Sequence, residues 1–238
     1  MSGTPSIARG LRVLRIITIV VLVAGYPYLV LHGLDHASAR TIGGVILAVV
    51  VVATAAAHDG ASRLLPLLVR RFGLLVVVSA AAAATNHPLA LTMLPTLTSL
   101  WLLASFGATL VRGPSMVGRF AVAMHDGFPD FLLPYCRKVT WMWCVFFALN
   151  AALGAVLALD APAAVWAFYT GVVSYVAVGA LAAGEYAFHK MRFRFYEDGW
   201  LDRIWRRLLP PQRSQLGRRT LEWQLEHQPR NAAAASTQ

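Results

Sequence analysis

Long apolar runs separated by short polar stretches dominate the chain up to residue 188. An α-helix needs roughly 20 apolar residues to cross the hydrocarbon core of a bilayer, and most of these runs approach that length. The pattern predicts an all-α fold, a polytopic transmembrane helical bundle of about six spans within residues 1–188. The predicted spans are residues 13–34, 41–57, 67–85, 89–111, 139–159 and 163–184.

Two segments are too polar to span and are expected to lie outside the bilayer. Residues 114–133 form a broken amphipathic segment, which we interpret as an interfacial helix followed by a turn. Residues 189–230 form a basic tail, in which apolar and charged positions recur at helical spacing over residues 199–209. This spacing predicts an amphipathic helix, either a surface anchor or a dock for a cytoplasmic partner. Residues 231–238 are expected to be disordered.

The composition excludes an ordinary soluble enzyme, because 58% of the residues are hydrophobic and only 13% are charged. Of the 21 Lys and Arg residues, all but Arg40 fall on one side of a six-span arrangement. The positive-inside rule makes that side cytoplasmic, which predicts a membrane protein with both termini inside. Topology and attraction to membrane lipids then explain the net charge of +10, so no nucleic-acid partner is expected.

Motifs for a reaction or a metal site are weak in this sequence. The tripeptides at residues 58–60 and 125–127 both read His-Asp-Gly, which suits a divalent ion but is also ordinary turn chemistry. His32 and His36 share a helix face near Asp35, at a predicted span end. The sequence contains no nucleophile elbow, no phosphate-binding loop and no zinc-protease motif. We therefore expect no metal and no cofactor, and favour a protein that is not an enzyme.

Polar side chains recur near the middle of three predicted spans. At a rise of 1.5 Å per residue, Ser99, Asn150 and Ser174 each lie roughly 16–18 Å from the predicted cytoplasmic end of their span. We expect these three residues to meet, with Tyr175 beside them, as a candidate binding cluster. The alternative is that they only hold the helices together, because hydrogen bonds between spans contribute about 0.6 kcal/mol each.

An acidic residue, Glu185, ends the sixth predicted span on the cytoplasmic side. Arg137 and Lys138 begin the fifth span there, and the short connection at residues 160–162 makes the two helices antiparallel neighbours. We expect an interfacial ion pair between Glu185 and Arg137 or Lys138. A proton-relay role is the alternative, because acids within membrane spans often mark function.

The region from Leu97 to Glu185 resembles small bacterial integral membrane proteins encoded in gene clusters for aryl polyene and related fatty-acid-like pigments. The matching pieces are Ser99, Phe106-Gly107, Leu110 to Pro114, residues 135–150, residues 166–175 and Gly184-Glu185. The first three spans match only in hydropathy, and the tail after Phe188 departs from the family pattern. The resemblance implies a six-span accessory protein of acyl-chain or polyene assembly in the bacterial inner (cytoplasmic) membrane. It does not supply the cysteine and two histidines of a ketosynthase, a label that some members carry.

Two functions follow from these expectations. The first is a non-enzymatic scaffold that recruits soluble, acidic acyl-carrier proteins or their enzymes to the inner leaflet, because a basic face steers acidic partners. Its surface would comprise Arg112, Arg119, Arg137, Lys138, Arg192, Arg194, Arg203, Arg206 and Arg207. The second is a transporter or flippase of a lipid-like intermediate, which would use the mid-membrane polar cluster as its path. The sequence sets no oligomeric state.

Overall fold

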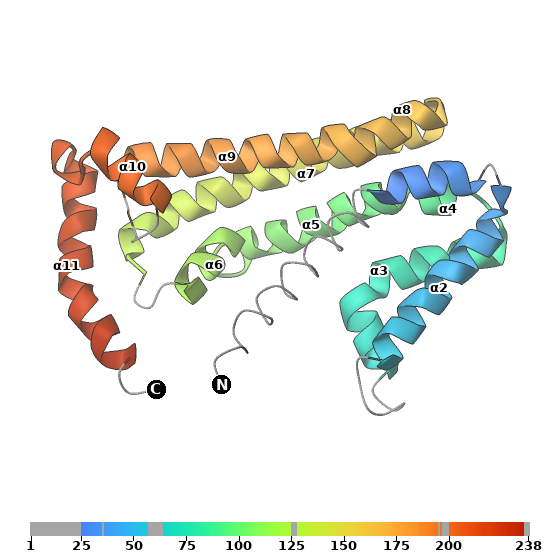
Figure 1. Ribbon diagram of the computed structural model, residues 1–238, viewed down its shortest axis with the longest axis horizontal. Coiled ribbons are helices and arrows are strands. Elements are labelled where there is room, and N and C mark those ends of the chain that lie inside the picture. The colour runs from blue at the N-terminus through green and yellow to red at the C-terminus, as the bar shows by residue number, and fades with distance from the viewer. Residues whose placement is uncertain are drawn as a thin grey trace, which may run out of the picture. The chain divides into compact units, whose positions relative to one another are not determined.

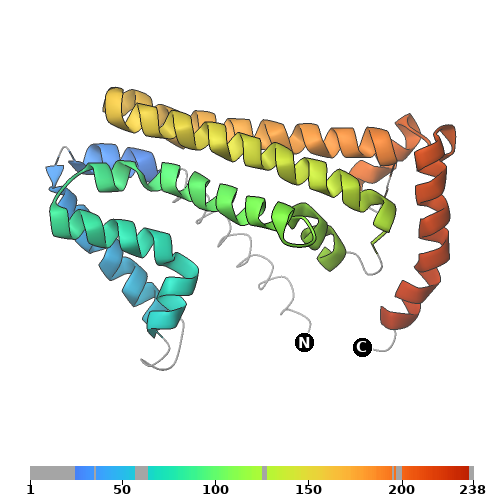
Figure 2. The ribbon, with the colours of Figure 1, turned by 180° about the vertical axis from the view of Figure 1, so that it is seen from behind.

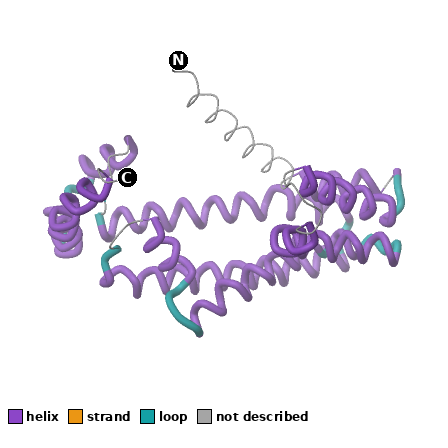
Figure 3. The backbone as a smooth tube through the Cα atoms, turned by 90° about the horizontal axis from the view of Figure 1, so that it is seen from below, coloured by secondary structure: helices purple, strands orange, loops and turns teal. Residues whose placement is uncertain are grey.

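The computed structural model describes residues 25–34, 36–56, 64–124, 128–194, 196 and 200–235, and within these ranges the fold is entirely helical (Figure 3). Among the described residues, three helical segments are long and apolar enough to cross a membrane, at Leu89–Val111, Asp130–Asp160 and Ala163–Phe193. Within the most apolar 18-residue stretch of each segment, only 17–22% is buried inside the protein. Apolar surface left open to this extent needs lipid around it, so the fold is that of a helical membrane protein.

The first half of the chain forms helices where the apolar runs predict them (Figure 1). Residues 25–34, the end of the first predicted span, are helical, and the rest of that span lies outside the described residues. The helices that follow are α2 (Ala39–Ala56), α3 (Leu64–Thr85), α4 (Leu89–Thr92) and α5 (Leu94–Val111). α3 ends where Asn86 adopts a left-handed conformation with φ of 55° and Pro88 follows, because proline disfavours helix at the residue before it.

The second half contains two helices that extend beyond the predicted spans. The elements are α6 (Met116–Met124), η2 (Asp130–Leu132), α7 (Leu133–Asp160), α8 (Ala163–Phe168), the π-helical turn η3 (Tyr169–Val173), α9 (Ser174–Phe193), α10 (Trp200–Leu208), η4 (Pro211–Arg213) and α11 (Gln215–Ala235). α7 begins before residue 139. α9 continues past residue 184 into the basic tail, and the cations in its last turn stabilise the C-terminal end of the helix. α11 reaches Ala235, inside the stretch expected to be disordered, because a run of alanines has the highest helix propensity.

The chain divides into two compact units, residues 1–103 with 145–176, and residues 104–144 with 177–238. The first unit has an apolar core in which Trp166 and Leu91 are almost fully buried. Val30, Ala39, Ala82 and Ala167 complete this core. The hydroxyl of Tyr26 donates to the carbonyl of Leu91 across 3.0 Å, so a polar group at the edge of the core is paired.

α2 and α3 lie side by side in the first unit (Figures 1 and 2). Gly43 permits their closest approach, since a Cβ at this position would lie 2.6 Å from the carbonyl oxygen of Ser79. At the end of α3, Arg40 donates from Nε to the carbonyl of Ala83 and from its backbone N–H to the side chain of Asn86. The one basic residue expected away from the cytoplasmic side therefore caps a helix C-terminus.

Within the second unit, α6 begins with all four of its first N–H groups paired. Met116 donates to Thr109 Oγ1, Val117 to Thr140 Oγ1 and Gly118 to Ser115 Oγ. The fourth, Arg119 N–H, donates to the carbonyl of Ser115. Thr109 and Thr140 belong to α5 and α7, so α6 is attached to both helices through its N-terminus. The helix predicted within residues 114–133 is present as α6, and the predicted break at residues 126–127 lies outside the described residues. The interfacial placement of this segment stays a prediction.

Candidate functional site

The structure brings Ser99, Asn150 and Ser174 into one hydrogen-bonded cluster in the first unit. Asn150 Nδ2 donates to Ser99 Oγ across 2.9 Å, and Ser99 Oγ donates in turn to the carbonyl of Pro95. Ser174 Oγ donates to Asn150 Oδ1 across 3.0 Å. Asn150 lies ten residues before Asp160, the end of α7, and so roughly 15 Å along the helix axis. That distance is about half of the hydrocarbon thickness of a bilayer.

A fourth residue, Tyr169, completes the cluster and is absent from the predicted set. Its hydroxyl donates to the same oxygen, Asn150 Oδ1, across 2.9 Å. In a regular α-helix, Tyr169 and Ser174 would be separated by about 140° around the axis. The π-helical turn η3 aligns residues five apart, because its backbone pairs residue i with residue i+5. Both hydroxyls therefore reach one acceptor, and a pattern based on α-helical periodicity does not reveal this.

The cluster uses most of the hydrogen-bonding capacity of Asn150. Its side-chain oxygen accepts two bonds and its NH₂ group donates one, which leaves one N–H. One turn away along α5, Thr96 Oγ1 is buried without a hydrogen-bond partner in the described part of the chain. A Cβ on Gly154 would lie 2.8 Å from that oxygen, so α5 and α7 approach closely here. The arrangement is suited first to holding three helical segments together.

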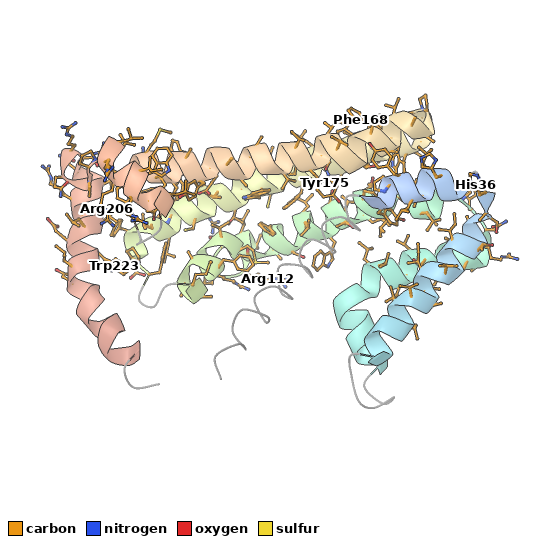
Figure 4. The ribbon with its side chains drawn as sticks, in the orientation of Figure 1. His36, Arg112, Phe168, Tyr175, Arg206 and Trp223 are labelled. Atoms are coloured by element: carbon orange, nitrogen blue, oxygen red, sulfur yellow. The ribbon has the colours of Figure 1, made fainter. Side chains whose placement is uncertain are left out.

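Tyr175 projects from a different side of its helix than Ser174. It is the second residue of α9, next to Ser174, and its side chain is 42% exposed (Figure 4). A residue adjacent to Ser174 projects about 100° away from it around the helix. The predicted binding set is thus divided, with three members in contact and the fourth on another face.

Glu185 contacts a residue other than the predicted cations. Tyr135 donates its hydroxyl to Glu185 Oε1 across 3.0 Å, and the Tyr135 ring packs against Phe188 and Phe193. Arg137 and Lys138 are exposed, and no ion pair joins either of them to Glu185. Arg137 is about 200° around α7 from Tyr135, and a long cationic side chain at a span end extends toward water. The expected ion pair is therefore replaced by a tyrosine–carboxylate hydrogen bond.

The described residues contain a buried ion pair that the sequence analysis did not identify. Lys190 Nζ lies 2.7 Å from Asp202 Oδ1 and 2.8 Å from Oδ2, and both side chains are only 8% exposed. Tyr186 also donates to Asp202, and the rings of Tyr186 and Tyr196 flank the ammonium group. This pair attaches α10 to the last turn of α9. Its signal in the sequence is slight: Lys190 is one of two lysines in the chain, and Asp202 is the only acid between residues 200 and 208.

Most of the predicted basic surface is exposed and belongs to the second unit. Exposed members are Arg112, Arg119, Arg137, Lys138, Arg192, Arg203, Arg206 and Arg207. Arg194 differs, because it is half-buried and donates to the carbonyl of Pro210 across 2.6 Å. Arg206, labelled in Figure 4, has its guanidinium 6.0 Å from the ring of Tyr196. Arg194 is thus a structural residue that positions the chain after α10.

Both His-Asp-Gly tripeptides and Asp35 lie outside the described residues. His36 pairs its Nδ1 with the carbonyl of His32 across 2.9 Å, so this ring binds the end of its own helix. Among the residues that the structure describes, no group of three or more His, Cys, Asp or Glu side chains is placed to hold a metal. Comparisons with protein-family models, curated proteins and solved structures found no match.

Proposed function

We propose that this protein is a non-enzymatic scaffold of a bacterial inner membrane, which recruits an acidic soluble protein to the cytoplasmic leaflet. One observation carries the proposal. The only acid of α10, Asp202, is buried and paired with Lys190, while Arg203, Arg206 and Arg207 stay exposed. The charged side chains of α10 that stay exposed are therefore all cationic, and a basic face of this kind attracts acidic partners through electrostatic steering.

The resemblance to proteins of polyene gene clusters suggests which partner to test first. Acyl-carrier proteins are acidic and soluble, and their attached chains become lipid-like as they grow. A scaffold that holds them at the inner leaflet would keep those chains close to the bilayer. The proposed surface combines α10 with Arg137, Lys138 and Arg192, which are exposed in the same unit.

Co-flotation with vesicles tests the recruitment directly. The protein is reconstituted into vesicles of phosphatidylethanolamine and phosphatidylglycerol, and a purified acyl-carrier protein is added at low salt. The variant Arg137→Glu with Arg203→Glu should lose recruitment, because it reverses two charges of the proposed surface, and both side chains are exposed. The variant Gln212→Glu adds a negative charge at an exposed position nearby and should keep it. Equal recruitment by the reversed variant and the wild type would contradict the proposal.

The membrane orientation is tested separately by cysteine labelling from either side. In the proposed six-span arrangement with both termini inside, single cysteines at Ser38 and Ala161 label from outside. Cysteines at Gly113 and Gln212 label only after the membrane is made permeable. Ser38, Gly113 and Ala161 lie just outside α2, α5 and α7, and Gln212 lies within η4. A position that labels from the opposite side would overturn the arrangement.

Transport of a lipid-like intermediate is the second candidate, and the π-helical turn at the Asn150 cluster favours it. π turns inside α-helices frequently occur at functional sites, and this one lies within a candidate span. Deletion of the gene separates the two functions. Loss of product with accumulated carrier-bound intermediates supports the scaffold, whereas product retained in the inner membrane supports transport. Mass spectrometry of whole-cell lipid and pigment extracts measures both.

A further inference from the structure

α10 has three chemically different sides. At 100° per residue, Leu201, Ile204 and Leu208 fall within about 60° of one another around the axis. Arg203 and Arg206 lie on roughly the opposite side, while Arg207 and Asp202 occupy the two flanks. A helix with an apolar face and a strongly basic face is typical of segments that lie in a membrane interface.

The Asp202 flank is fixed in position. Besides the ion pair with Lys190, the hydroxyl of Tyr196 donates to the carbonyl of Leu209 across 2.8 Å, just after α10 ends. Arg194 donates to Pro210 next to it. Both ends of α10 are therefore tied to the region where α9 ends, so the helix has little freedom to rotate about its axis.

The apolar side is left open by these contacts. Leu201 is 43% exposed, Ile204 49% and Leu208 67%. Exposed side chains of this size at helical spacing form a continuous apolar strip, and such strips mark binding surfaces. Because the other flank is fixed, the strip is presented in one direction.

The attachment point also sets where α10 lies relative to a bilayer. Lys190 belongs to the last turn of the candidate span Ala163–Phe193, so the ion pair holds α10 beside the point where the span ends. Arg207, at the flank of the apolar strip, is positioned to meet lipid phosphates, and Trp205 supplies an aromatic ring of the kind enriched at the headgroup level.

We propose that α10 lies in the cytoplasmic membrane interface, with Leu201, Ile204 and Leu208 inserted among the lipids and an anionic phospholipid surface as its partner. Arg203 and Arg206 then face the cytosol. The inference uses the proposed orientation in the membrane but does not depend on recruitment of a soluble protein. In this placement the apolar side of α10 contacts lipid, and its basic side is open to a soluble partner.

Depth measurements on single labels test this placement. A background with Cys136→Ala and Cys144→Ala accepts a fluorescent label at Ile204→Cys or, as the matched control, at Arg203→Cys. Each protein is reconstituted into vesicles of phosphatidylethanolamine and phosphatidylglycerol. Lipids with brominated chains quench from the bilayer, and iodide quenches from water. The ratio of lipid to iodide quenching should be several-fold higher at position 204 than at position 203. Adding Leu208→Asp should lower the ratio at 204, and vesicles of phosphatidylcholine alone should lower it as well.

Two results would overturn the inference. Equal access of iodide to both labels would mean that α10 stands away from the membrane. Shielding of position 204 from both quenchers would mean that another protein surface covers the strip. The variant Arg203→Glu with Arg137→Glu should leave the quenching of the label at position 204 unchanged even where it abolishes recruitment. A failure of the proposed function is thereby distinguishable from a failure of this inference.

Discussion

Asn150 of α7 donates a hydrogen bond from Nδ2 to Ser99 of α5 across 2.9 Å. Its side-chain oxygen, Oδ1, accepts hydrogen bonds from the hydroxyls of Tyr169 and Ser174. One amide thus joins three helical segments. When helices separate within a bilayer, polar groups of this kind lose their hydrogen bonds and face hydrocarbon. Removing these hydrogen bonds should therefore lower the stability of the protein by a measurable amount.

The variant Asn150→Leu should lower the free energy of unfolding by about 2 kcal/mol. Three hydrogen bonds are removed, and bonds between membrane helices contribute about 0.6 kcal/mol each. Unfolding in mixed micelles measures the change. Leu149→Ala, at an exposed position next to Asn150, is the control and should change stability much less. A loss no greater than that of the control would mean that the cluster does not hold the helices.

The variant Gly43→Ala should destabilise the packing of α2 against α3. Its Cβ would lie 2.6 Å from the backbone oxygen of Ser79, and backbone cannot move away cheaply. Overpacking of this kind costs about 1–3 kcal/mol. Gly44→Ala is the matched control, because nothing lies within 4 Å of a Cβ there. The control should be neutral or stabilising by up to about 1 kcal/mol, and thermal unfolding in detergent compares the two.

Removing one partner of the Lys190–Asp202 pair should release α10 from α9. Lys190→Met or Asp202→Leu leaves an uncompensated buried charge, which costs about 3–5 kcal/mol. The double variant should recover part of that loss, since neither charge remains. Amide hydrogen exchange over residues 200–208 reports the release. Equal exchange in the single variants and the wild type would show that the pair does not position the helix.

The attachment of α10 should also weaken at alkaline pH. Burial raises the pKa of Tyr196, Asp202 raises it further, and Arg194 and Arg206 lower it. The neutral phenol therefore stabilises the folded state fully below its ordinary pKa of about 10. That stabilisation is lost as the pH rises through the raised pKa. Fluorescence of Trp205 should stay constant up to about pH 10 and change above it, and Tyr196→Phe should remove this alkaline step.

Helical rise and hydropathy were sufficient to place Ser99, Asn150 and Ser174 at one depth, and the structure brings them into contact. They were insufficient for Tyr169, because an extra residue in a π turn shifts the phase of everything after it. Spacing along the sequence placed Glu185 at the end of its helix, whereas α9 continues to Phe193, and it did not identify the residue that pairs with Glu185. Arg137 and Lys138 follow Tyr135 within three positions along α7, yet Tyr135 is the residue that pairs with Glu185.

In the tail, too, the sequence pattern predicted a helix but not its contacts. Periodicity over residues 199–209 predicted the helix that is present as α10 and separated its apolar positions from its charged ones. It assigned Asp202 to the polar side together with the arginines. A contact between residues 190 and 202 depends on how the chain turns between two helices, and hydropathy carries no information about that turn.

The connection between α5 and α6 has a consequence for how this chain can change in length. Surface loops usually tolerate insertions, because each added residue costs little entropy. Here residues 112–115 connect α5 to α6, and the first two N–H groups of α6 donate to hydroxyls on α5 and α7. One inserted residue would shift the register of both donors at once. This short loop should therefore not tolerate insertions or deletions, although nearly all of it is exposed.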